Sequence, residues 1–159
     1  MALIAVYPGT FDPITNGHTD LAKRACKIFD KVIIAVAEKP QKVPLLHIDE
    51  RINLVKKIFE NEKKIEVYPL NKLLVEFCCE NKASVILRGL RAVSDFEYEV
   101  QLASMNRSLQ PKIESVFMSP AEEYSFLSSS IVKDIAKHNG DIEKFVHTDV
   151  AIVLRNKFK

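Results

Sequence analysis

Short apolar segments alternate with amphipathic segments along this chain, and this alternation restricts the folds open to it. Strand candidates lie at Leu3–Tyr7, Val32–Ala37, Ile65–Pro69, Val85–Arg88 and Ser115–Met118. Helical three- and four-residue spacing of apolar residues covers Thr19–Phe29, Asp49–Phe59, Lys72–Asn81 and Phe96–Leu109, and two more helices are expected at 128–138 and 149–157. Strands that each precede a helix are typical of βαβ units, so we predict an α/β fold built on a doubly wound, five-stranded parallel sheet.

Length and composition predict one folded domain over residues 1–159. Hydrophobic residues make up 47% of the chain and charged residues 28%, as in ordinary globular proteins. The net charge of only +2 provides no basic face for nucleic acid. No segment approaches the roughly 20 apolar residues that a membrane span requires, and the first residues do not resemble a signal peptide. We therefore expect a cytoplasmic protein with neither nucleic acid nor membrane as a partner.

The three cysteines, Cys26, Cys78 and Cys79, show no metal or disulfide pattern. Their number is odd and no C-x-x-C spacing occurs, which argues against a zinc site or a disulfide framework. The adjacent pair Cys78–Cys79 lies within a helical pattern, where packing is the favoured role and redox activity the alternative.

The turn after the first strand has the composition of a phosphate-binding loop. Residues Tyr7 to His18 read Y-P-G-T-F-D-P-I-T-N-G-H and lead into a helix, whose N-terminal N–H groups attract anions. Gly9 and Gly17 would allow close backbone approach or positive φ, although a plain tight turn is the alternative. The helix dipole would keep His18 neutral and able to donate a hydrogen bond to a phosphoryl oxygen.

Two further segments carry groups suited to polyphosphate. Arg88-Gly89-Leu90-Arg91 ends the fourth strand, and Ser128-Ser129-Ser130 begins a later helix. With a strand order of 3-2-1-4-5, the switch point between strands one and four would bring Thr10 and His18 beside the two arginines. The alternatives are a solvated arginine pair and a serine helix cap.

These motifs resemble known families. The T-x-G-H element and the L-S-S-S-I-V-K segment resemble the signatures of the nucleotidylyltransferase superfamily, which has a Rossmann-like fold. R-G-L-R-A-V-S-D-F-E-Y-E, Q-L-A-S-M-N-R and Y-S-F-L-S-S-S, together with the first turn, resemble the bacterial phosphopantetheine adenylyltransferase family along essentially the whole chain. That resemblance implies transfer of the adenylyl group of ATP to 4′-phosphopantetheine, giving dephospho-coenzyme A and pyrophosphate.

The resemblance also implies roles for individual residues. His18 would stabilise the transition state, and the acceptor would be bound by Thr10, Lys42, Leu74 and Arg88. ATP would be bound by Thr10, Phe11, His18, Gly89, Leu90, Arg91, Glu99, Tyr124, Ser125, Phe126, Leu127, Ser128, Ser129 and Ser130.

Cofactor and assembly follow from the same resemblance. Mg²⁺ would be held mainly by the phosphates, with no protein metal ligand. Asp95, Glu97 and Glu99 have the composition of a metal cluster, but at the start of a helix they are equally first-turn acids favoured by the helix dipole. A homohexamer and feedback by coenzyme A are implied as well. The functional alternatives are a related nucleotidylyltransferase with another acceptor and an ATP-binding module that does not turn ATP over.

Overall fold

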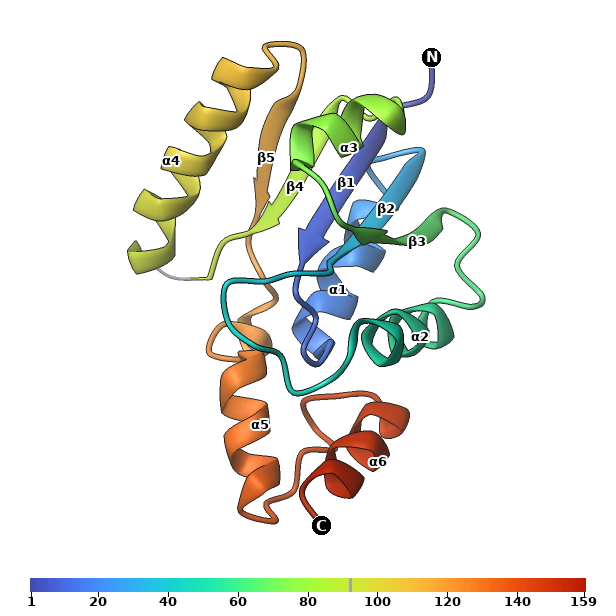
Figure 1. Ribbon diagram of the computed structural model, residues 1–159, viewed down its shortest axis with the longest axis vertical. Coiled ribbons are helices and arrows are strands. Elements are labelled where there is room, and N and C mark those ends of the chain that lie inside the picture. Colours follow the sequence, from blue (N-terminus) through green and yellow to red (C-terminus); the bar gives the residue numbers. More distant parts are fainter. Residues whose placement is uncertain (92) are drawn as a thin grey trace.

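The computed structural model describes residues 1–91 and 93–159, and its centre is a parallel sheet. The strands are β1 (Ile4–Gly9), β2 (Lys31–Ala37), β3 (Ile65–Leu70), β4 (Val85–Gly89) and β5 (Glu114–Met118). They pair in the order β3-β2-β1-β4-β5, and every pairing is parallel (Figure 1). The predicted fold class and strand order are confirmed.

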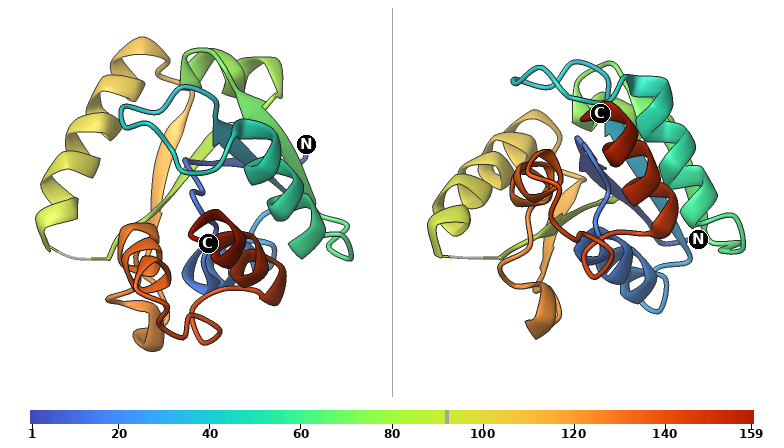
Figure 2. Two further views of the ribbon diagram at one scale, coloured as in Figure 1. Left: turned by 60° about the horizontal axis from the view of Figure 1, so that its bottom comes forward. Right: turned by 90° about the horizontal axis from the view of Figure 1, so that it is seen from below.

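The helices follow the predicted alternation. They are α1 (Asn16–Ala25), α2 (Ile48–Ile58), α3 (Leu74–Glu80), α4 (Val93–Leu109), α5 (Ser129–Lys137) and α6 (Thr148–Lys157), with a short 3₁₀ helix, η1 (Glu122–Tyr124), in the expected loop. Figure 2 shows α6 beside α2, and the ion pairs Lys57–Asp149 and Lys157–Glu50 join these two helices. Among the described residues, no helix is both long enough and apolar enough to span a membrane.

Helix α1 has the largest boundary error, because it ends at Ala25 and not at Phe29, and it also begins at Asn16 and not at Thr19. Thr15 caps this helix by accepting a hydrogen bond from the His18 N–H. A cap contributes no apolar residue, so apolar periodicity cannot detect it. Strand β1 also runs on to Gly9, because Pro8 and Gly9 pair with Ala35 and Val36 of β2. The earlier start of α1 and the later end of β1 shorten the turn between them.

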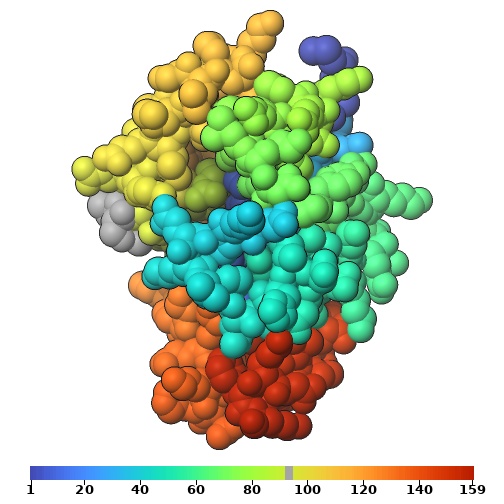
Figure 3. Space-filling view, in the orientation of Figure 1, coloured from blue at the N-terminus to red at the C-terminus, as the bar shows by residue number. Residues whose placement is uncertain are grey.

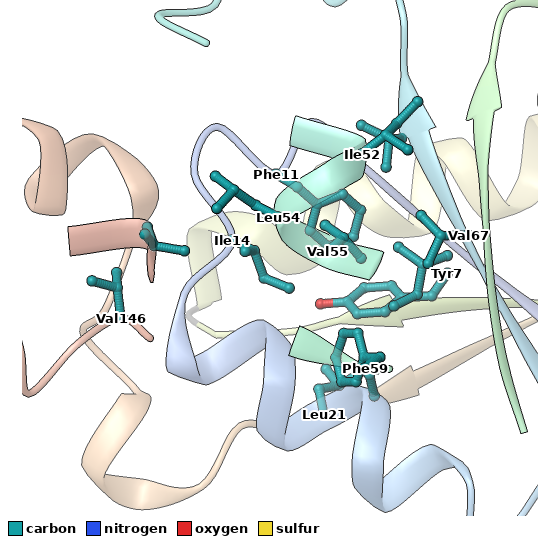
Figure 4. Close-up of a cluster of buried hydrophobic side chains, with 14 of the residues drawn as sticks. Tyr7, Phe11, Ile14, Leu21, Ile52, Leu54, Val55, Phe59, Val67 and Val146 are labelled. Carbon is teal, nitrogen blue, oxygen red and sulfur yellow. The ribbon is translucent and has the colours of Figure 1, made fainter. Parts of the chain in front are cut away.

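Apolar side chains cover both faces of the sheet. On one face the larger cluster packs α1, α2, α5 and α6 against the strands, and Figure 4 shows part of it around Tyr7, Leu21 and Phe59. The smaller cluster on the other face holds α3 through Val75, Phe77 and Cys78. Burial raises the pKa of the Cys78 thiol to about 12, which disfavours the reactive thiolate. Cys78 therefore has a packing role, whereas Cys79 is exposed.

Two buried charged side chains hold the loops above β1 and β2 in place. Asp12 is 4% exposed and accepts hydrogen bonds from the Leu45 and Leu46 N–H groups, each at 2.9 Å, and from Lys133 Nζ at 2.8 Å. Asp12 therefore joins the first turn to the 38–47 loop and to α5.

Arg51, which is 1% exposed, completes this network. It donates to three carbonyl oxygens, those of Leu46 at 3.1 Å, Thr10 at 2.8 Å and Ala37 at 2.7 Å. Buried charges are tolerated when they are paired and hydrogen-bonded in this way.

We expect Asp12→Ala to lower the free energy of unfolding by about 3 kcal/mol, because it leaves two amide N–H groups and a partly buried ammonium group without their acceptor. Urea denaturation measures the change. The matched control is Glu143→Ala, which breaks an exposed 3.1 Å pair with Arg155 and should cost less than about 1 kcal/mol. Equal losses in the two variants would contradict a special role for Asp12.

Candidate active site

A cavity of about 330 Å³ opens at the carboxyl ends of β1 and β4, between the first turns of α1 and α5. This is the switch point of the sheet, where ligands bind in doubly wound folds. In the space-filling view the surface is hollowed between α3 and α4, above the 38–47 loop (Figure 3). Predicted site residues that line the cavity are His18, Arg88, Gly89, Arg91, Glu99, Tyr124, Leu127, Ser128, Ser129 and Ser130.

The imidazole of His18 is fixed in one tautomer by the start of α1. The Thr15 backbone N–H donates to His18 Nδ1 at 2.9 Å, and the Thr15 hydroxyl lies 3.0 Å from the same nitrogen. A backbone N–H can only donate, so Nδ1 is the unprotonated nitrogen and the neutral ring carries its proton on Nε2. Because Nδ1 is bound to the helix start, Nε2–H remains as the donor that His18 can offer to a ligand.

His18 is neutral at physiological pH. Burial and, to a smaller extent, the positive charge of Arg91 lower its pKa to about 4. The sequence correctly predicted a neutral donor but assigned the effect to the helix dipole alone. Desolvation is the larger cause, and it depends on contacts that the sequence does not display.

Gly9 and Gly17 both line the cavity, but neither has the positive φ that was one of their two expected uses. No described glycine has positive φ, and the positive φ of the turn, 50°, belongs to Phe11. At Gly9 an added Cβ would lie 2.9 Å from the Phe11 ring, so glycine is required there for close packing. Phe11 was predicted to bind ATP. Its ring is 2% exposed and packs edge-on against His18 with ring centroids 5.0 Å apart, where it supports the imidazole.

Arg88 and Glu99 form a bidentate ion pair across the cavity wall. Arg88 Nε and Nη2 donate to the two Glu99 carboxylate oxygens at 2.8 and 2.7 Å. Burial lowers the pKa of Arg88, but the hydrogen bonds and charge of Glu99 outweigh this effect and leave the pKa above its usual value. Glu99 was predicted to contact ATP, and in this structure both its oxygens are bound to Arg88. The pair fixes the plane of the guanidinium group at the cavity.

Arg91 and the serine segment connect β4 to α5. Arg91 Nη1 donates to the Leu127 carbonyl at 2.8 Å. Ser128 caps α5 by accepting from the Ile131 N–H at 3.2 Å, and the Ser129 hydroxyl donates to the Pro13 carbonyl at 2.8 Å. Two of the three serines thus have structural partners, while the first-turn N–H groups of α5 lack intrahelical acceptors and suit an anion at the cavity.

The structure places other predicted residues outside the cavity lining. Thr10 is half-buried, with its carbonyl held by Arg51. Lys42 is exposed on the 38–47 loop, and Leu74 packs against the cluster under α3. The Leu90 N–H donates to the Met118 carbonyl. Ser125 and Phe126 follow η1, and Phe126 is 91% exposed.

Sequence reasoning did not assign Tyr7, Pro8, Thr15, Leu21, Asp95 or Pro120 to the cavity lining. Thr15 could have been found, because Thr15 and His18 have the spacing of a capping box, in which residues i and i+3 bond reciprocally. No local pattern could have identified Tyr7 or Leu21, since both read as ordinary core residues.

Asp95, Glu97 and Glu99, which could be a metal cluster or first-turn acids by sequence, are not grouped around a common point. Glu99 is bound to Arg88, Asp95 lies 3.7 Å from Arg91, and Glu97 is exposed. Within residues 1–91 and 93–159, no three His, Cys, Asp or Glu side chains are grouped to hold a metal ion. The carboxylates of the cavity thus fit arginine neutralisation better than direct metal binding.

The fold and this site define a nucleotidyltransferase. Residues 6–135 match the family model described as cytidylyltransferase-like, and the chain belongs to the cytidylyltransferase-like family. The matched segment includes the first turn, the Arg88–Glu99 pair and the serine segment of α5.

Solved structures show the same fold at low sequence identity. A nicotinate-nucleotide adenylyltransferase structure from Vibrio parahaemolyticus has a TM-score of 0.75 and 16% identity, over 98% of this chain and 93% of that one. The Plasmodium falciparum nicotinic acid mononucleotide adenylyltransferase complexed with NaAD has a TM-score of 0.71 and 18% identity, over 99% and 96%. A lipopolysaccharide core biosynthesis protein from Thermoplasma volcanium has a TM-score of 0.60 and 21% identity, over 77% of this chain and 100% of that one.

We expect His18 to titrate near pH 4 and its neutral ring to carry the proton on Nε2. ¹⁵N NMR, with resonances assigned from a His18→Asn variant, would measure both the pKa and the tautomer. The unfolded chain binds this proton near pH 6.5 and the folded protein only near pH 4. His18 therefore lowers the free energy of unfolding as the pH falls from 6.5 to 4, and the variant should show a shallower decline. A measured pKa near 6.5, or a proton on Nδ1, would contradict this assignment.

Proposed function

We propose that this protein transfers the adenylyl group of ATP to 4′-phosphopantetheine, giving dephospho-coenzyme A and pyrophosphate. The observation that carries adenylyl transfer is the convergence of a neutral His18 Nε2–H donor, Arg88, Arg91 and the start of α5 on one cavity. All of these groups are donors or cations, which suits a substrate with several phosphate groups.

The proposed acceptor is supported by the R-G-L-R-A-V-S-D-F-E-Y-E segment. Its first and last residues, Arg88 and Glu99, form the bidentate pair of the cavity wall, and Arg91 and Asp95 lie between them. The segment that resembles the phosphopantetheine adenylyltransferase family is therefore also the segment that builds the wall of the cavity.

The reaction is an in-line displacement at the α-phosphorus. An oxygen of the acceptor phosphate forms the new P–O bond, the bond from the α-phosphorus to the bridging oxygen of the β-phosphate breaks, and pyrophosphate leaves with that electron pair. A phosphate monoester has its second pKa near ~6 and is mostly dianionic at pH 7, so no general base is needed. The protein supplies positioning and charge stabilisation.

Each wall of the cavity then has a role in this scheme. His18 Nε2–H donates to a non-bridging oxygen of the α-phosphate, where negative charge must be stabilised in the transition state. Arg91 and the first turn of α5, with Ser128–Ser130, bind the β- and γ-phosphates. Gly89, Leu90, Glu99 and residues 124–127 complete the ATP site, and Thr10 and Phe11 contribute from the first turn.

The acceptor would approach from the side of the 38–47 loop and α3. Arg88 is held in place by Glu99 and presents its guanidinium to the acceptor phosphate, while Lys42 and Thr10 contribute further donors. Leu74, at the start of α3, would contact the pantetheine arm. Mg²⁺, when bound, would neutralise phosphate charge and be held chiefly by phosphate oxygens, because both cavity carboxylates face arginines.

A cytoplasmic homohexamer with coenzyme A as a feedback ligand completes the proposal. Exposed apolar side chains on α4, among them Phe96, Tyr98, Met105 and Leu109, support association between copies of the chain. The rival acceptor is a nicotinate mononucleotide, which the similarity in fold to two nicotinate-nucleotide enzymes favours.

A pyrophosphate-release assay with ATP and Mg²⁺ tests the acceptor. We expect turnover with 4′-phosphopantetheine and at most a background rate with nicotinic acid mononucleotide, since only the former matches the proposed pantetheine site. Omitting ATP, Mg²⁺ or the acceptor in turn gives the controls. Faster turnover with the nicotinate acceptor would replace the proposed substrate, and ATP binding without turnover on either acceptor would favour a non-catalytic module.

His18→Ala should lower kcat by roughly 10²–10³-fold, because it removes one donor to the charge that develops in the transition state. The affinity for ATP, measured by calorimetry, should change much less. His138→Ala is the matched control, since His138 is an exposed residue at the end of α5. A near-normal kcat in His18→Ala would contradict the proposed role of His18 in stabilising the transition state.

A further inference from the structure

Tyr7 is a buried polar residue of the cavity to which the proposed function assigns no role. It lies on β1, two residues before the strand ends, and is 6% exposed. Its ring packs edge-on against Phe11 with centroids 5.4 Å apart and lies 6.4 Å from the His18 ring. Figure 4 shows this ring within the apolar cluster and its hydroxyl at the end away from the backbone.

The hydroxyl of Tyr7 has no hydrogen-bond partner within the described residues, yet it is not sealed in the core. Buried side-chain polar atoms without partners are absent from the described part of the chain, so the oxygen retains contact with open space. Tyr7 is one of the residues that line the active-site cavity. Buried hydroxyl groups nearly always find a partner, and phenylalanine would fill the same apolar volume without this requirement.

The surroundings of the hydroxyl indicate which kind of partner is missing. Burial raises the pKa of Tyr7, and the charges of Arg88 and Arg91 oppose this effect only in part, so the phenol keeps its proton and can donate. The neighbouring cavity groups, His18 Nε2–H and the two arginines, are donors as well. The two carboxylates that line the cavity, Glu99 and Asp95, pair with Arg88 and Arg91. The Tyr7 hydroxyl therefore needs an acceptor that the cavity wall does not provide, and an oxygen of the substrate would supply it.

We propose that the Tyr7 hydroxyl donates a hydrogen bond to a non-bridging oxygen of the α-phosphate of ATP, beside His18. The inference rests on the proposed adenylyl transfer and extends it with a second donor at the reacting phosphate. Tyr7 and His18 come from β1 and α1, and both rings pack against Phe11, so the two donors are held by one apolar support. Rigid support of this kind places donors without reorganisation during the reaction.

Tyr7→Phe removes one oxygen atom and leaves the ring packing intact. We expect kcat/KM for pyrophosphate release to fall by roughly 10- to 100-fold and the affinity for ATP to fall several-fold, with the melting temperature unchanged or raised. Tyr68→Phe is the matched control, because Tyr68 is an exposed residue of β3 whose hydroxyl bonds Glu66. That variant should keep the wild-type values.

Tyr7→Phe values of kcat/KM and ATP affinity within twofold of wild type would overturn the inference. Calorimetry with ATP alone separates it from the proposed function. If the wild-type protein turns over neither acceptor, the proposed function fails, and the several-fold loss of ATP affinity in Tyr7→Phe still decides the role of the hydroxyl. A loss of activity accompanied by a lower melting temperature would assign Tyr7 to packing and also overturn it.

Discussion

The site depends on the buried charges of Asp12 and Arg51. Asp12 binds two backbone N–H groups of the 38–47 loop and the Lys133 ammonium of α5, and Arg51 binds three carbonyl oxygens that end or follow β1 and β2. Loop backbone that is removed from water must find partners elsewhere, and these two side chains provide them. The first turn, the loop that carries Lys42 and the serine helix are held together by this network.

The side chains that offer donors to the cavity are held in place by hydrogen bonds to other residues of the protein. Thr15 holds the His18 tautomer, Glu99 holds Arg88, and the Leu127 carbonyl holds Arg91. Each bond engages only part of the side chain and leaves at least one further N–H group on it. Donors fixed in this way lose little conformational entropy when a phosphate binds, which favours electrostatic stabilisation of the transition state.

Much of the fold was predictable because it follows local and repeating patterns. Near-continuous apolar strands such as Val32–Val36 and the amphipathic segments between them predicted the sheet, and the strand order placed the ligand cavity. The T-x-G-H and serine motifs were placed correctly at the starts of α1 and α5. The errors lie at the ends of helices and strands. There the boundary is set by capping residues and strand-pairing partners, which apolar periodicity does not reveal.

The order of apolar and amphipathic segments was enough to predict the fold class, and the motifs predicted which donor-rich segments meet at the carboxyl edge of the sheet. Which individual residues line the cavity could be seen only in the folded protein. Packing between separate elements placed Phe11 against His18, bound Glu99 to Arg88, buried Arg51 and made Tyr7 part of the cavity lining. The physical reason is that motifs are local in the chain, whereas burial and ion pairing depend on residues from separate elements. The pKa of His18 near 4 likewise arises from burial and from Arg91, 73 positions further along the chain.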